Sequence, residues 1–138
     1  MDAIEYIPHT ADIRLKVTGS SPKDLFETAL TGMSNLMRNH YCDKKRELPL
    51  DIKIKLDAPD FTTLLIDFLS EVLTLSNLHQ AIYCRVYFEQ LSDHILDARL
   101  FGAHVRKFDE DIKAVTYHEA NITHSPTGEF ETMIVFDI

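Results

Sequence analysis

The sequence predicts an α+β fold, a single two-layer domain in which two helices cover one face of a largely antiparallel sheet of about seven strands. Three observations lead to this prediction: short segments whose apolar residues alternate, two early segments with apolar residues at helical spacing, and turn residues between successive strands. The length of 138 residues is near the commonest size of a domain. We therefore expect residues 1–138 to share one core.

The chain opens with two segments, residues 3–7 and 13–17, in which apolar and polar side chains alternate. A period of two is typical of strands with one buried face. A polar loop over residues 9–12 connects them, and a third alternating segment follows at residues 50–56. These patterns predict three strands.

The period changes at Ser21, where a helix is predicted over about residues 22–38. Ser21 suits the N-cap, Pro22 suits the first helical position, and Asp24 completes an S-x-x-D capping box. One stripe of apolar residues then follows at helical spacing. Its members are Leu25, Phe26, Ala29, Leu30, Met33, Leu36 and Met37.

Asp60 is the predicted cap of a second helix, whose apolar stripe from Phe61 to Leu73 is wide enough to pack on a sheet. The rest of the chain predicts strand pairs joined by turns. The first pair covers residues 81–89 and 95–100 around Ser92-Asp93, and the second covers residues 112–122 and 130–138 around Pro126-Thr127-Gly128.

Acidic side chains outnumber basic ones by twenty-two to fourteen, which gives a formal net charge of −8. A negative protein repels phosphate backbones, so direct tight binding to nucleic acid is not expected. The run Lys44-Lys45-Arg46 is a local exception, and such short charge runs are most often solvated loops. We favour the solvated loop over a binding patch.

Cys42 and Cys84 are the only cysteines, and their spacing matches neither a C-x-x-C motif nor a zinc site. We therefore expect no disulfide framework, no structural zinc and a reducing compartment. The acidic start of the chain is unlike a signal peptide, and no apolar run approaches the roughly 18 residues of a membrane span. Together these features predict a cytoplasmic protein without membrane contact.

Motifs for nucleotide, dinucleotide or zinc-protease chemistry and the G-x-S-x-G nucleophile motif are absent from the sequence. The seven histidines are dispersed, so no pair at helical spacing offers a metal face. We assign no catalytic residues and favour a non-enzymatic protein over a metal-dependent hydrolase, which needs a positioned water and an open coordination position.

Carboxylates form the candidate site. Asp12 alone fits a turn residue, but Asp137 and the α-carboxylate of Ile138 end a predicted strand together. If that strand end meets Asp12, each pair of charges at about 4 Å repels by roughly 4 kcal/mol at an effective dielectric of about 20. Hard oxygen ligands suit Ca²⁺ or Mg²⁺, whereas a basic side chain is the alternative counter-charge. Lys113 is the candidate for it, unless it is only a surface lysine of an edge strand.

Four separated segments together resemble the archease family, in the family's order and over essentially the whole chain. The segments are H-T-A-D-I at residues 9–13, L-L-I-D-F-L-S-E-V-L at residues 64–73, K-A-V-T-Y-H at residues 113–118 and V-F-D-I at residues 135–138. The chain is identified as a member of this family.

The resemblance implies an accessory factor of the RtcB-type RNA ligase of tRNA splicing, not the ligase itself. Such a factor promotes guanylylation of the ligase, allows multiple turnover and widens the choice of nucleoside triphosphate. The resemblance also implies a divalent-metal site for calcium, with Asp12, Asp137 and Ile138 as ligands, and a role for Lys113 in activating the ligase.

One residue departs from the family pattern, because Arg14 follows H-T-A-D-I where glycine is usual. Its guanidinium could pair with the carboxylates and weaken the affinity for a metal. The alternative function is a general chaperone or protein-modulating module, which an open sheet face and an acidic surface would also support.

Overall fold

The computed structural model describes residues 3–5 and 12–138. The described part contains seven strands, two α-helices and a short 3-10 helix, so the predicted α+β class and strand number are confirmed. In chain order the elements are β1 (Asp12–Gly19), α1 (Pro22–Met37), η1 (Tyr41–Asp43), β2 (Leu50–Asp57), α2 (Phe61–His79), β3 (Ala81–Leu91), β4 (Ile95–His104), β5 (Ala114–Thr116), β6 (Thr123–His124) and β7 (Phe130–Asp137).

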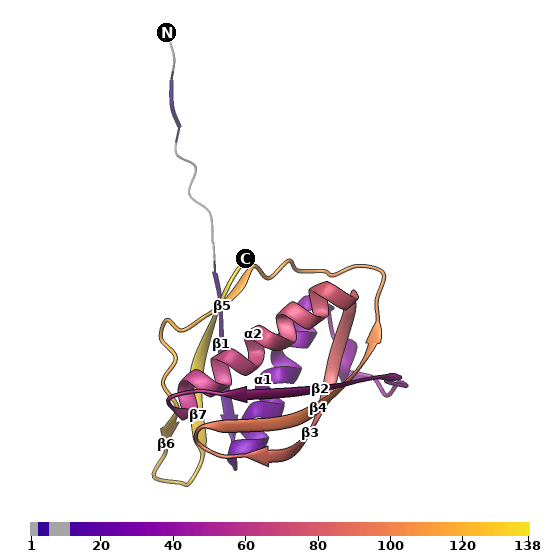
Figure 1. Cartoon of the computed structure of the whole chain (residues 1–138). Coiled ribbons are helices and arrows are strands. Elements are labelled where there is room, and N and C mark those ends of the chain that lie inside the picture. The colour runs from indigo at the N-terminus through magenta and orange to yellow at the C-terminus, as the bar shows by residue number, and fades with distance from the viewer. Residues whose placement is uncertain (1–2, 6–11) are drawn as a thin grey trace.

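The strands form two antiparallel sheets where we expected one. The first sheet has the order β1-β7-β5, with β6 also paired to β7, and the second has the order β2-β4-β3. Both helices contact strands of both sheets, so they join the sheets around one core (Figure 1). Alternation shows which face of a strand is buried but not which strand is its partner, and this is why the division escaped prediction.

Helix boundaries follow the predicted caps. In α1 the Oγ of Ser21 accepts a hydrogen bond from the backbone N of Asp24 at 3.1 Å. The Asp24 carboxylate reaches back to the backbone N of Ser20 at 2.8 Å, one residue before the position that a capping box would use. In α2 the carboxylate of Asp60 accepts from the backbone N of Thr63 at 2.7 Å, which confirms the predicted cap.

Two predicted strands differ from the structure. Residues 3–5 form no strand, whereas residues 6–11, including most of the predicted loop, lie outside the described part. The predicted strand over residues 112–122 is confined to β5, because a turn follows in which the backbone N of Ala120 donates to the carbonyl of Tyr117. Glu119 in this turn has φ 63°, a left-handed conformation that a strand does not contain.

Helix α2 is the most apolar element of the fold. Its 19 residues, with a mean hydropathy of 1.3, are long and apolar enough to cross a membrane by length and composition alone, contrary to the expectation from the sequence. Asp67 and Glu71 are partly exposed, whereas Leu65, Phe68 and Leu69 are completely buried, and the helix contacts strands of both sheets and α1. Helix α2 is therefore a helix of the hydrophobic core.

Cys42 and Cys84 form a disulfide with their Cα atoms 5.3 Å apart, so the prediction that they form none is wrong. The bond ties η1, just after α1, to β3, and 42 positions of sequence separate the two cysteines. Such a separation carries no spacing signal, and only the packing of α1 on β3 brings the thiols together. The argument for a reducing compartment from unpaired cysteines no longer applies.

Candidate functional site

Two of the predicted metal ligands face each other at one end of the first sheet. Asp12 begins β1, Asp137 ends β7, and the two are register partners in the antiparallel pair. Residues directly opposite each other point to the same face, with Cβ atoms about 5 Å apart. Ile138 follows immediately, and Figure 1 shows the C-terminus beside the start of β1. The fold thus brings the three predicted ligand residues to one sheet end.

Lys113 lies at the same sheet end, directly before β5. Its backbone N donates a hydrogen bond to the carbonyl oxygen of Asp137 at 2.7 Å, and Ala114 is the register partner of Asp137. The Lys113 side chain is exposed. All four predicted site residues therefore lie at the same end of three adjacent strands, although more than a hundred positions of sequence separate Asp12 from the others.

The donor chemistry of this sheet end fits a hard cation. Within residues 3–5 and 12–138 no group of three or more His, Cys, Asp and Glu side chains could hold a metal ion, and the predicted set has two such side chains with the α-carboxylate as its third member. Its oxygens are the ligands that Ca²⁺ and Mg²⁺ prefer, and thiolate or imidazole is not among them. Asp12, Asp137 and Ile138 would hold the ion.

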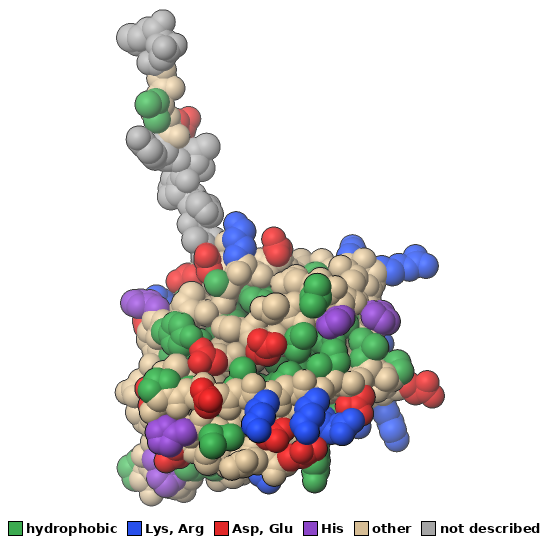
Figure 2. Space-filling view, in the orientation of Figure 1, with side chains coloured by type: hydrophobic (Ala, Val, Ile, Leu, Met, Phe, Trp, Pro, Cys, Tyr) green, Lys and Arg blue, Asp and Glu red, His purple; other side chains and the backbone are tan. Residues whose placement is uncertain are grey.

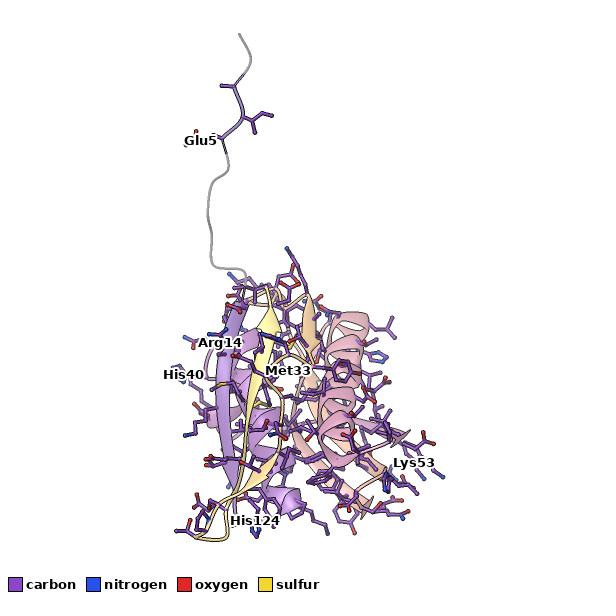
Figure 3. The ribbon with its side chains drawn as sticks, turned by 90° about the vertical axis from the view of Figure 1, so that its left-hand side faces the viewer. Glu5, Arg14, Met33, His40, Lys53 and His124 are labelled. Carbon is purple, nitrogen blue, oxygen red and sulfur yellow. A yellow bond between two sulfur atoms is a disulfide. The ribbon has the colours of Figure 1, made fainter. Side chains whose placement is uncertain are left out.

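Arg14 pairs with a carboxylate outside the predicted set. Its Nε lies 2.8 Å from the carboxylate of Glu119, in the turn after β5. Figure 3 shows Arg14 projecting from the outer side of β1. Because both partners are about half exposed, this pair adds little stability, but it engages the guanidinium with Glu119, and in the described part of the chain no ion pair within 4.0 Å is found between Arg14 and Asp12 or Asp137.

A further contact near this site was missed from the sequence. The hydroxyl of Tyr117 donates a hydrogen bond to the carboxylate of Asp67 in α2, and this bond together with burial raises the pKa of Tyr117. Tyr117 and Asp67 both lie in segments that resemble the family. That resemblance is the only sequence feature that marks both residues. The contact fixes the chain directly after β5 to the helix, and so holds the strand that Lys113 precedes.

The Tyr117→Phe variant tests that contact. We expect its free energy of unfolding to be lower by about 0.5–1.5 kcal/mol, as for a single hydrogen bond. The difference should shrink as the pH rises above about 10, because the unfolded chain then loses its tyrosine proton before the folded one does. Urea unfolding at two pH values measures both effects. Tyr87→Phe is the control, since Tyr87 is 62% exposed and no hydroxyl contact is found for it among the described residues.

A hollow of about 590 Å³ lies between the start of α2 and the segment that leads to β7. Its carboxylate and its imidazole are already engaged, because Asp60 caps α2 and His124 bonds to the carbonyl of Gly128 while stacking on Phe130 at 4.4 Å. These contacts leave no acid–base pair in the hollow. The carboxylate end of the first sheet is the better candidate site.

The fold and this site define a small α+β protein in which two aspartates face each other at one sheet end with a lysine beside them. The model of the archease protein family (MTH1598/TM1083) matches residues 4–138. Two relatives named protein archease are each 30% identical: that of Pyrococcus furiosus aligns over 97% of both chains, and that of Methanosarcina barkeri over 97% of this chain and 94% of its own. The chain belongs to the archease family.

Two solved structures have the same fold. The solution structure of protein 1598 from Methanobacterium thermoautotrophicum has a TM-score of 0.74 at 21% identity and covers 96% of each chain. The crystal structure of an archease from Thermotoga maritima, described as a possible chaperone, has a TM-score of 0.71 at 19% identity and covers 100% of this chain and 99% of that one. At these identities the likeness shows the fold alone.

Proposed function

We propose that this archease is a non-catalytic activator of an RtcB-type RNA ligase in tRNA splicing, acting in the cytoplasm. It promotes guanylylation of the ligase, supports multiple turnover and widens the choice of nucleoside triphosphate. The observation that carries the proposal is the pairing of Asp12 with Asp137 beside Lys113 and the terminus. Four positions that resemble the family's functional positions thus meet in one place.

The carboxylates act by binding a divalent cation, which we take to be Ca²⁺. Asp12 is partly exposed and Asp137 is exposed, so both can reach an ion that also contacts a partner protein. When bound, such an ion supplies positive charge that attracts phosphate oxygens. The aspartates and the terminus hold it at the rim of the domain, where the ligase can meet it.

Lys113 supplies a second positive charge at this rim. The hydrogen bond from the backbone N of Lys113 to Asp137 fixes the position of the Lys113 backbone, and the exposed side chain extends from there. An ammonium group in this position can orient a nucleotide phosphate in the ligase pocket. The archease therefore contributes binding and orientation, and the ligase contributes the chemistry.

The test measures GMP transfer to the purified ligase and its turnover, with and without this protein. We expect Asp12→Asn and Asp137→Asn each to lower the stimulation at least about tenfold, equivalent to about 1.4 kcal/mol, because each removes one charged ligand. Lys113→Gln should also lose stimulation. Asp57→Asn and Lys55→Gln are the controls, since both residues are exposed on β2 of the other sheet.

A binding measurement separates the metal site from the activation. Ca²⁺ at about 100 times its dissociation constant should stabilise the protein by about 2.7 kcal/mol in thermal unfolding. Asp12→Asn should reduce this stabilisation, whereas Lys113→Gln should keep it. No stimulation of the ligase by the unmodified protein would refute the function, and full stimulation by all three site variants would refute only the site.

A general chaperone is the second candidate, because the T. maritima relative is described as a possible chaperone. Large apolar side chains on the surface of this chain would favour it, among them Leu78 at 73% and Tyr87 at 62% exposed. Single exposed apolar residues are normal, however, and both charge signs are interspersed over the face in Figure 2. Suppressed aggregation of unrelated proteins without any effect on the ligase would favour the chaperone.

A further inference from the structure

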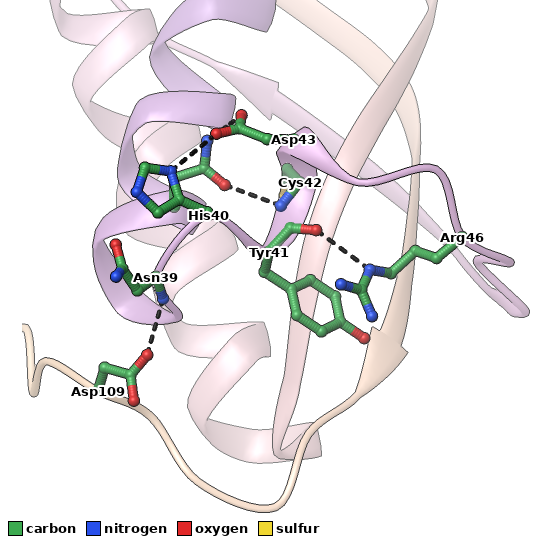
Figure 4. A network of polar contacts seen from close by, with 8 residues as sticks. Asn39, His40, Tyr41, Cys42, Asp43, Arg46 and Asp109 are labelled. Atoms are coloured by element: carbon green, nitrogen blue, oxygen red, sulfur yellow. Dashed lines mark hydrogen bonds and ion pairs between the residues drawn. The ribbon is translucent and has the colours of Figure 1, made fainter.

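The loop after α1 is held rigidly by its own polar contacts. Asn35 accepts a hydrogen bond from the backbone N of Cys42 at 2.8 Å and donates one to the carboxylate of Asp43 at 2.8 Å. The other oxygen of that carboxylate lies 3.0 Å from the ring of His40 (Figure 4). The disulfide from Cys42 to Cys84 then fastens the loop to β3. This segment therefore has a fixed shape.

Four basic side chains surround one hollow on this loop. Lys44, Lys45, Arg46 and Arg85 line a space of about 290 Å³ with the disulfide in its wall, and we call these four residues the basic patch. Asp43 is the one acidic residue of the lining, and both of its oxygens are engaged with Asn35 and His40. The patch therefore concentrates positive charge in a protein of net charge −8.

The charges of the basic patch are not neutralised by ion pairs in the part of the chain that the structure describes. Arg38, Lys53 and Arg99 each pair with a carboxylate there, whereas no ion pair within 4.0 Å involves any patch residue. Surface charges that serve only solubility are normally interspersed with opposite charges, as on the outer face of the second sheet. Four unpaired cations around one hollow attract an anion instead.

Arg46 is already oriented for such a ligand. Its Nε donates to the carbonyl of Tyr41 at 3.1 Å, and its guanidinium carbon lies 3.6 Å from the centre of the Tyr41 ring (Figure 4). The two terminal nitrogens make no hydrogen bond among the described residues and remain available as donors. Because the side chain is held in advance, binding costs less conformational entropy.

The shape of the site favours a chain of phosphates over a single one. A second hollow of about 300 Å³ adjoins the first, and Lys44 and Arg46 line both. The cations therefore follow an extended path along the loop, as in grooves that track the backbone of a single strand. Tyr41, an aromatic residue, lines the second hollow with them.

We propose that the basic patch binds consecutive phosphate groups of a single RNA strand. The choice of RNA over another polyanion rests on the proposed function, since an activator of an RNA ligase works beside the RNA. The patch lies on the loop after α1 and on β3, away from the strands that carry Asp12 and Asp137. The sheet end with Asp12 and Asp137 would contact the ligase, while the basic patch would bind the RNA substrate of the ligase. The negative charge of the rest of the protein disfavours RNA binding anywhere outside the patch.

Fluorescence anisotropy with a labelled single-stranded RNA of about 12 nucleotides tests the proposal on the oxidised full chain. Four phosphate contacts predict that log affinity falls with log salt at a slope of about −3, from about −0.7 per contact. In the Lys44→Gln/Lys45→Gln variant the slope should weaken to about −1.4, with roughly tenfold lower affinity at low salt. Lys23→Gln/Lys55→Gln removes the same charge from exposed positions outside the patch and should bind normally.

Three results would overturn the proposal: no RNA binding at about 50 mM salt, equal losses in the two double variants, or competition by free GTP as strong as that by RNA. The assay contains no ligase, so it is independent of activation. Asp12→Asn should bind RNA normally while losing stimulation of the ligase. If the unmodified protein does not stimulate the ligase but still binds RNA through the patch, the proposed function is refuted and the RNA-binding proposal is retained.

Discussion

Replacing Phe26 by alanine should lower the free energy of unfolding by about 3–5 kcal/mol. Phe26 is completely buried, and its ring contacts three others: Phe61 at 5.2 Å, Phe68 at 5.5 Å and Phe88 at 6.1 Å between centroids. These rings come from α1, α2 and β3, so one side chain joins both helices to the second sheet. The variant loses the transfer free energy of the ring and leaves a cavity at this junction.

Urea unfolding followed by circular dichroism measures this loss. Phe101→Ala is the matched control, because Phe101 is only partly buried. Its loss should be well below that of Phe26→Ala, and Phe26→Leu should fall between the two, since leucine refills much of the space. Equal losses for the two alanine variants would contradict the central position that we assign to Phe26.

Replacing both Cys42 and Cys84 by serine should lower the free energy of unfolding by about 3–4 kcal/mol. The disulfide closes a loop of sequence separation 42, and that closure restricts the unfolded chain far more than the folded one. The loop contains β2, α2 and the start of β3, so the bond restricts the conformations that this large part of the unfolded chain can adopt.

A reducing agent provides the control for the second prediction. The reduced wild-type protein should have a free energy of unfolding close to that of the Cys42→Ser/Cys84→Ser variant. The stability of the variant itself should be the same with and without the reductant. Counting free thiols in the unfolded, unreduced protein gives an independent check. Two free thiols, or a stability that the reductant leaves unchanged, would contradict the disulfide and its contribution.

Capping and turn residues correctly predicted where the helices begin and where the last turn lies. The Ser21 cap and the Asp60 cap both form, and α1 and α2 begin at the predicted residues. Gly128 adopts φ 89° in the predicted turn before β7, where its backbone N donates to the carbonyl of Ser125. A cap or a tight turn depends on neighbours within about four residues, so the sequence contains the whole interaction.

Features that depend on distant partners were not predictable in the same way. The strand expected over residues 112–122 is shortened after Thr116, where Tyr117 binds Asp67 fifty positions away. The single expected sheet is divided in two, and Arg14 pairs with Glu119. Arg85 lies beside the run Lys44-Lys45-Arg46 around one hollow only because the disulfide and the packing of α1 on β3 bring them together.

The sequence by itself determined the α+β class, the two helices and the carboxylates at Asp12, Asp137 and Ile138, because periodicity, caps and residue chemistry are local properties. Only the tertiary structure decided that Asp12 faces Asp137, that Lys113 stands beside them and that Cys42 joins Cys84. These juxtapositions follow from strand register and helix packing, which bring together residues far apart in the chain. The metal role of the carboxylates remains the prediction that ion binding and the ligase assay will test.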